Sequence, residues 1–211
     1  EKGYVNTEHP GLDGTVFEYN GHLYFVYAGY GSFPEYGSAL YLAEMGNPWT
    51  LKGENILLSK PEFDWEKQGG MAINEGPVML QRNGKLFLVY SASATWSDDY
   101  ALGMLTASDE ADLLQAESWK KSSQPVFKKS VENRVFAPGH NGFTKSPDET
   151  EDWIVYHAVP ESEAGSSRRS TRIQKFSWKA DGTPDFGIPL PVSTPIPVPS
   201  GEEAAEESSD L

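Results

Sequence analysis

Cysteine is absent from the 211-residue chain, which excludes disulfide bonds and thiolate chemistry. No run of roughly 18 consecutive apolar residues occurs, so the sequence predicts no membrane-spanning helix. Basic residues are also few, because 17 Lys and Arg stand against 31 Asp and Glu, for a net charge of −14. Such a surface repels phosphates, so a nucleic acid is not an expected partner, whereas a neutral ligand suits it.

Five of the acids lie in the last ten residues, 202–211. A short acidic segment with few apolar side chains cannot bury enough surface to offset the entropy of ordering it. Residues 202–211 are therefore predicted to form a disordered acidic tail, and residues 1–201 the folded part.

The folded part repeats one pattern three times. In residues 73–92 a carboxylate opens a short apolar strand, an Asn-Gly turn reverses the chain, and an aromatic-rich strand returns. Residues 13–28 repeat this design with a second Asn-Gly turn, and residues 140–158 repeat it with a Ser-Pro-Asp turn. The polar residues that open the three repeats, Asp13, Glu75 and His140, are 62 and 65 positions apart. A near-constant interval is typical of repeat architectures.

Each repeat has the pattern of about four antiparallel strands over roughly 60 to 70 residues. Strands do not alternate with helical segments, which argues against a parallel α/β fold. The sequence therefore predicts an all-β fold in which each repeat is one blade of a β-propeller. The alternative is a β-sandwich or jelly roll whose hairpins resemble one another by coincidence.

The propeller prediction brings polar side chains together. The first strand of each blade lines the central axis, so Asp13, Glu75 and His140 would meet at one end of the channel. The loops that follow the second strand of each repeat, residues 29–37, 93–100 and 159–170, would surround the same opening. Their aromatic and basic side chains are those of Tyr30, Phe33, Trp96, Arg168 and Arg169.

Acidic groups at the floor of a pocket and aromatic rings at its rim suit a carbohydrate, whose hydroxyls hydrogen-bond while its ring faces stack. We therefore predict a carbohydrate substrate that contacts Phe33, Trp96, His140 and Arg169. Each residue alone has an ordinary explanation, because an acid beside glycine is common in turns and a lone histidine is commonly structural. Three polar residues at equivalent repeat positions favour a shared site.

Five groups of residues also resemble a known family. They are residues 12–17, 74–77, 90–93 with 99–103, 137–141, and 172–178 with 181–187. In this order they resemble glycoside hydrolase family 43, the five-bladed propeller arabinofuranosidases, xylosidases and arabinanases. The resemblance implies that Glu75 is the general acid and that Asp13 is the second carboxylate, which orients Glu75 and tunes its pKa.

The chemistry of inverting glycoside hydrolysis agrees with these roles. A carboxylic acid protonates the leaving oxygen, and a carboxylate roughly 6.5–9.5 Å away activates water. A glutamic acid can serve near neutral pH when its pKa is raised, and the charge of Asp13 and a partly dry pocket would both raise it. No cofactor is required for this chemistry.

The resemblance also suggests a structural Ca²⁺ on the propeller axis, where many family members hold a hydrated cation beside a histidine. His140 would be its neighbour here, with water between them. A tight zinc site is not expected, because no second His or Cys lies at ligand spacing. Since calcium prefers oxygen ligands, we expect His140 to have a structural or pKa-supporting role.

One family feature is missing from the sequence. The family carries its catalytic base, an Asp, upstream of the segment matched by residues 12–17, and the acids before Asp13 are Glu1 and Glu8, neither in a strand-like context. Three repeats are also fewer than the four to eight blades that close a propeller. We therefore expect this chain to supply roughly the last three blades of a five-bladed propeller. A separate N-terminal fragment or chain, made by proteolysis or from a split gene, would supply the base and the other blades.

The substrate within the family is less constrained. The aromatic-rich loop at residues 94–100 resembles that of the arabinofuranosidase branch. A pocket closed by Phe33 and Trp96 would favour exo removal of terminal α-L-arabinofuranosyl residues from arabinan or arabinoxylan oligosaccharides. The alternatives are a β-xylosidase, an endo-arabinanase, and a propeller that binds carbohydrate without cleaving it.

Overall fold

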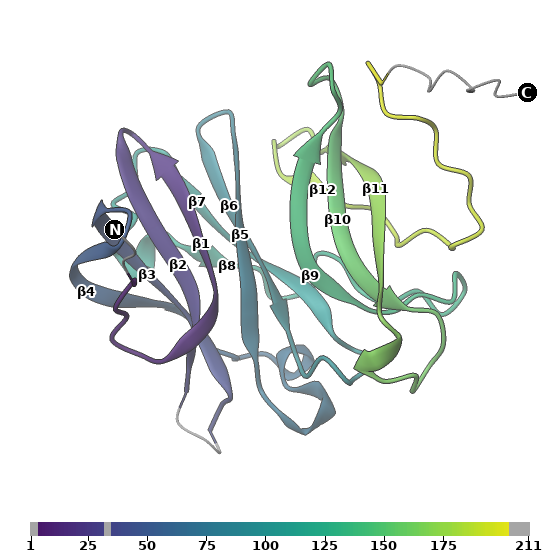
Figure 1. The fold of residues 1–211 in the computed structure, drawn as a ribbon, viewed down its shortest axis with the longest axis horizontal. Helices are drawn as coiled ribbons and strands as arrows, with labels where there is room; N and C mark the ends of the chain where they lie inside the picture. Colours follow the sequence, from purple (N-terminus) through teal and green to yellow (C-terminus); the bar gives the residue numbers. More distant parts are fainter. Residues whose placement is uncertain (1–3, 32–34, 203–211) are drawn as a thin grey trace, which may run out of the picture.

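The computed structural model describes residues 4–31 and 35–202, which form three four-stranded antiparallel sheets (Figure 1). The first sheet contains β1 (Gly11–Tyr19), β2 (His22–Tyr30), β3 (Ser38–Asn47) and β4 (Thr50–Ser59). The second contains β5 (Asn74–Arg82), β6 (Lys85–Ala92), β7 (Ala101–Ser108) and β8 (Lys120–Lys121). The third contains β9 (Phe136–Lys145), β10 (Asp152–Val159), β11 (Ser170–Trp178) and β12 (Pro184–Asp185). The strands of each sheet follow chain order, which confirms the all-β fold and the three blades.

In the part of the chain that the structure describes, helical structure is limited to four short 3-10 turns: η1 (Asp64–Glu66), η2 (Gln68–Gly70), η3 (Ala116–Ser118) and η4 (Ser166–Arg168). Within residues 4–31 and 35–202, no helix has the length and apolar character needed to cross a membrane. Residues 109–115 form turns and bends, and η3 begins at Ala116. The fourth strand of the first sheet, β4, is ten residues long.

The three sheets fan out from their first strands, as the blades of a propeller do (Figure 1). β1 contacts β5, and β5 contacts β9, so the first strands of successive blades are neighbours near the axis. The segment between β4 and β5 and the connection between β10 and β11 lie at the same, lower end of the view in Figure 1. The chain therefore forms part of a propeller, in which the expected rim loop at residues 159–170 lies at the same end as the segment between β4 and β5.

The tight turns follow from the sequence. Asn20 and Gly21 both have positive φ, 50° and 77°, and so do Asn83 and Gly84, 48° and 72°. Two successive left-handed residues make the hairpin turn whose twist matches that of the strands it joins, and Asn-Gly adopts it at low cost. The predicted β1–β2 and β5–β6 hairpins are therefore confirmed.

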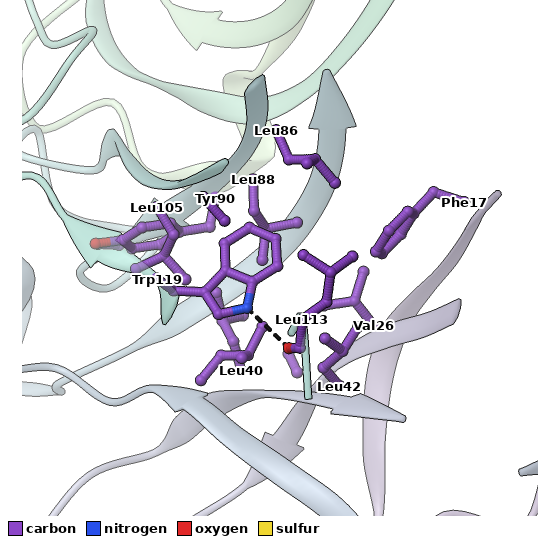
Figure 2. Close-up of a cluster of buried hydrophobic side chains, with 14 residues drawn as sticks. Phe17, Val26, Leu40, Leu42, Leu86, Leu88, Tyr90, Leu105, Leu113 and Trp119 are labelled. Atoms are coloured by element: carbon purple, nitrogen blue, oxygen red, sulfur yellow. Dashed lines mark hydrogen bonds between the residues drawn. The ribbon is translucent and has the colours of Figure 1, made fainter. Parts of the chain in front are cut away.

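The second sheet is buried on both of its faces. Leu86, Leu88 and Tyr90 of β6 pack against the first sheet, in the cluster drawn in Figure 2. Phe87 and Val89, which alternate with them, pack against the third sheet. Because neighbouring side chains of a strand point to opposite faces, a strand between two sheets needs apolar residues at every position. This explains the continuous apolar run of β6.

A buried polar network fixes the beginning of β5. The side chain of Glu66 is fully buried and accepts hydrogen bonds from Tyr90 Oη and Asn74 Nδ2, each at 2.9 Å. Lys121 Nζ lies 2.8 Å from Glu66 Oε1, and the backbone N–H groups of Glu62 and Phe63 donate to Oε2. Burial raises the pKa of Glu66, but the bonds from Lys121 and the backbone outweigh it and hold the pKa below its usual value. The network thus ties Asn74, the residue before Glu75, to η1 and β8.

Replacing Lys121 with Met should lower the free energy of unfolding by about 3–5 kcal/mol, because Glu66 would stay buried without its counter-charge. Denaturant unfolding of the chain measures this loss. Lys120→Met, at the exposed neighbouring position of β8, is the matched control and should change stability little. Equal effects of the two substitutions would contradict a stabilising role for the buried pair.

Candidate active site

The first strands of the three blades share a backbone irregularity near their beginnings. Asp13, Gly76 and His140 have φ of 56°, 55° and 52°, and the strand register shifts beside Asp13 and Gly76. These left-handed residues are the equivalent positions of the repeat, so Glu75 lies one residue before its expected equivalents. A glycine occupies the position in β5, where a Cβ would lie 3.2 Å from His140 Nδ1.

Hydrogen bonds join the strand beginnings across blades. The backbone N–H of Gly76 donates to Asp13 Oδ2 at 3.1 Å, and Thr15 Oγ1 donates to the carbonyl of Pro77 at 2.8 Å. The backbone N–H of His140 donates to Ser91 Oγ at 2.7 Å. His140 Nε2 lies 3.9 Å from Asp13 Oδ1. The structure therefore brings Asp13, Glu75 and His140 to one place.

Glu75 is partly buried, and its carboxyl has one close partner. Tyr100 Oη donates to Glu75 Oε1 at 2.6 Å. Burial raises the pKa of Glu75, the Tyr100 hydroxyl opposes that rise, and the negative charge of Asp13 adds to it. The positive charges of His140 and Arg169 also oppose it, but the net effect is a raised pKa. The carboxyl is therefore more easily kept protonated than an ordinary glutamic acid.

His157 is a further histidine of this site, and the sequence did not identify it. Its ring stacks on Tyr100 with centroids 5.5 Å apart and on His140 with centroids 6.2 Å apart. Burial, followed by the positive charges of Arg169 and His140, lowers the pKa of His157 to about 4. His157 is therefore neutral near pH 7. The available signal was its position in the second strand of its repeat, where the other two repeats have Ala28 and Ser91.

The predicted rim residues differ in where they lie relative to Glu75. Arg169 lies just after η4, with Nη1 3.4 Å from His157 Nε2, so it belongs to the same group of side chains. Trp96 is 52% exposed, and its indole N–H donates to the carbonyl of Gly69 at 2.9 Å, which holds it on η2. Phe33 lies outside the residues that the structure describes, as does the acidic segment 203–211.

Comparison with known proteins decides the family. The family model for glycosyl hydrolases family 43 matches residues 1–184. The chain belongs to this family. An extracellular exo-alpha-(1->5)-L-arabinofuranosidase of Streptomyces avermitilis is 45% identical over 197 residues, which are 90% of this chain and 40% of that protein. Alpha-L-arabinofuranosidase 43 of Humicola insolens is 43% identical over 206 residues, 94% of this chain and 42% of that protein.

A solved family 43 structure shows the same architecture. The alpha-L-arabinofuranosidase from Lactobacillus brevis superposes with a TM-score of 0.86 at 44% identity, over 92% of this chain and 61% of that one. A thermostable family-43 glycoside hydrolase superposes with a TM-score of 0.80 at 28% identity. The chain spans about 40% of the length of the curated relatives it matches.

A cation on the family 43 axis stays a prediction. In residues 4–31 and 35–202, no group of three or more His, Asp or Glu side chains is arranged to hold a metal ion. Because calcium binds through several oxygen ligands, these side chains do not form a calcium site by themselves. We assign no residue as a direct metal ligand.

The Asp13→Asn substitution should lower the pKa of Glu75, because it removes a nearby negative charge but keeps an oxygen that can accept from the N–H of Gly76. Carbon-13 NMR of labelled glutamate side chains, with Glu75→Gln to assign the resonance, measures the midpoint. Asp109→Asn is the control and should leave the midpoint in place, because Asp109 follows the end of β7, whereas Tyr100, the partner of Glu75, precedes its beginning. An unchanged midpoint in Asp13→Asn would exclude electrostatic coupling of the two carboxyls.

Proposed function

We propose that this chain carries the acid side of the active site of an inverting, exo-acting α-L-arabinofuranosidase, with Glu75 as the general acid. The observation that carries the proposal is the environment of Glu75: a partly buried carboxyl with a raised pKa, beside the second carboxylate Asp13. Two carboxyls whose environments differ are typical of paired acid and base roles. The names of the 43–45% identical relatives support the substrate.

The reaction assigns a defined step to Glu75. Its carboxyl transfers a proton to the glycosidic oxygen as the bond between that oxygen and the anomeric carbon breaks. A water molecule attacks the opposite face of the sugar and passes a proton to a base, so the product has inverted configuration. The carboxylate left on Glu75 then regains a proton from solvent.

We propose that the base is a carboxylate outside residues 1–211, in a part of the protein corresponding to the length of the relatives that this chain does not match. Asp13 is not suited to that role, because its Oδ2 accepts a hydrogen bond from the backbone N–H of Gly76 and its charge, on β1, raises the pKa of Glu75 on β5. Asp13 instead orients β5 and keeps the pKa of Glu75 high. A completing N-terminal fragment is the partner that this assignment requires.

We propose that substrate contacts come from the rim. Arg169 is exposed, carries five N–H donors and lies beside His157, so its guanidinium can bind sugar hydroxyls. His140 has a half-exposed side chain next to Asp13 and can do the same. Trp96 presents an exposed indole whose N–H is already bonded, which leaves its ring face for a sugar.

Glu75→Gln should reduce the release of terminal arabinose from α-1,5-arabino-oligosaccharides by about 10²–10⁴-fold in kcat. The loss should be smaller for an aryl arabinofuranoside with an acidic phenol, because such a leaving group departs without protonation. Rates of hydrolysis of the two substrates test the assignment, measured with the chain together with the N-terminal fragment that completes the propeller. Glu110→Gln, in the turn after β7, is the control.

Three results would contradict all or part of the proposal. An equal loss on both substrates would remove Glu75 from the role of acid. Binding of arabino-oligosaccharide without any hydrolysis by the completed protein would favour a carbohydrate-binding propeller. Release of xylose in preference to arabinose would replace the substrate but keep the mechanism.

A further inference from the structure

We propose that Tyr100 is the positioning residue of Glu75. Its hydroxyl donates a hydrogen bond to Oε1, which leaves Oε2 as the oxygen that carries the transferable proton. This inference rests on the proposed role of Glu75 as the acid. It assigns to Tyr100 a contribution that depends on the hydroxyl group and not only on the packing of the ring.

The ring of Tyr100 is held from several sides. The side chain is fully buried at the end of the loop between β6 and β7. Its Cε1 lies 2.2 Å from where a Cβ of Gly139 would be, so this ring position requires a glycine in β9. The ring also stacks in parallel on His157 of β10, the cross-strand partner of Gly139, with an interplanar angle of 7°. Tyr100 therefore bridges the second and third sheets while its hydroxyl reaches β5.

The loop that carries Tyr100 is itself attached to the third sheet. The backbone N–H of Ala137 donates to the carbonyl of Asp98 at 3.0 Å, and the backbone N–H of Glu163 donates to Asp98 Oδ1 at 2.9 Å. The N–H of Tyr100 donates to the carbonyl of Ser97 at 3.1 Å. These bonds fix the loop independently of the hydroxyl, so removing the hydroxyl oxygen should leave the ring in place.

The hydroxyl serves both protonation states of Glu75. Burial, with the charge and hydrogen bond of Glu75, raises the pKa of Tyr100 well above its ordinary value, so Tyr100 stays a neutral donor. When Glu75 is protonated, the bond to Oε1 directs the proton to Oε2. After proton transfer the same bond meets a carboxylate and becomes stronger, because charge-assisted hydrogen bonds are the stronger kind. Tyr100 therefore stabilises the product state of the proton transfer.

Tyr100 acts on Glu75 among several charged and titratable groups. Asp13 of β1 raises the pKa of Glu75, while His140 of β9 and Arg169 after η4 lower it. His157 of β10 is neutral and contacts the ring of Tyr100, not its hydroxyl. The Tyr100 hydroxyl is the largest of the influences that lower the pKa. Its loss should therefore shift the titration of Glu75 to higher pH.

The experiment is an NMR titration of the full chain, alone and together with the N-terminal fragment that completes the propeller. Glutamate carboxyls and tyrosine Cζ carry carbon-13 labels. In the wild type, the Tyr100 Cζ resonance should follow the midpoint of Glu75. In Tyr100→Phe the Glu75 midpoint should move to higher pH. Tyr156→Phe is the matched control, since it removes the hydroxyl of another buried tyrosine, bonded to Gln174 of β11, and should leave the midpoint unchanged.

Activity gives a second readout. Tyr100→Phe should lower kcat about 10- to 100-fold with little change in KM, because one hydrogen bond to a developing charge is lost. It should also move the alkaline limb of the pH profile upward, with the NMR midpoint. A merely structural role would change stability and KM and leave both midpoints in place.

The outcomes separate the two proposals. The positioning role is overturned, even if the enzyme is active, by either of two results. One is a Glu75 titration midpoint that is equal in wild type and Tyr100→Phe. The other is a wild-type Tyr100 Cζ resonance that does not shift as Glu75 titrates. If Tyr100→Phe fails to fold, the wild-type Cζ titration decides alone. Inactivity of the completed wild type with a shifted midpoint in Tyr100→Phe overturns the proposed function and supports the hydrogen-bonded geometry.

Discussion

Burial of the second sheet on both faces is the constraint on which the structure depends. Its strand β6 packs Leu88 against the first sheet and Val89 against the third. Figure 2 shows the first of these interfaces, with Trp119 donating to the carbonyl of Leu113 at 2.9 Å. Because the two interfaces share one sheet, the positions of β1 and β9 relative to β5 are set by apolar packing. The polar site at the strand beginnings is a consequence of that packing.

The left-handed residues at the strand beginnings connect the fold to the site. Asp13 and His140 adopt a backbone conformation that is uncommon for residues other than glycine. Such conformations persist where the surroundings impose them, and they cluster at functional sites. Here they accompany bulges that turn the carboxyl of Asp13 towards the backbone of Gly76. The same irregularity recurs in three blades, so the site is built from a repeated element of the fold.

The carboxyls of Glu66 and Glu75 have pKa values that are shifted in opposite directions. Glu66 is fully buried, but Lys121, Asn74, Tyr90 and two backbone N–H groups surround it, and its pKa is lowered. Glu75 receives one hydroxyl and faces the charge of Asp13, and its pKa is raised. The number of donors and the sign of the nearest charge, not burial alone, decide which carboxyl stays ionised. The first is suited to holding structure and the second to giving up a proton.

The sequence by itself determined the local structure: the Asn-Gly hairpins, the repeat of about one blade per 60 to 70 residues, and the polar residues near the beginnings of the first strands. These depend on turn chemistry and on side-chain alternation, which act between residues close in the chain. It also carried the family resemblance that the comparison confirmed over residues 1–184. It placed the equivalent of Asp13 one residue early, because only backbone geometry distinguishes Glu75 from Gly76.

The tertiary structure alone decided which side chains surround Glu75. Tyr100 is 25 residues away in sequence and reaches Glu75 of β5 from the loop between β6 and β7. Lys121 reaches Glu66 across 55 residues. His157 joins the group from β10, and Arg169, which the sequence placed only at the rim, contacts His157 from the connection between β10 and β11. No local pattern encodes these contacts, since they depend on how three sheets pack, and packing sums apolar contacts over the whole chain.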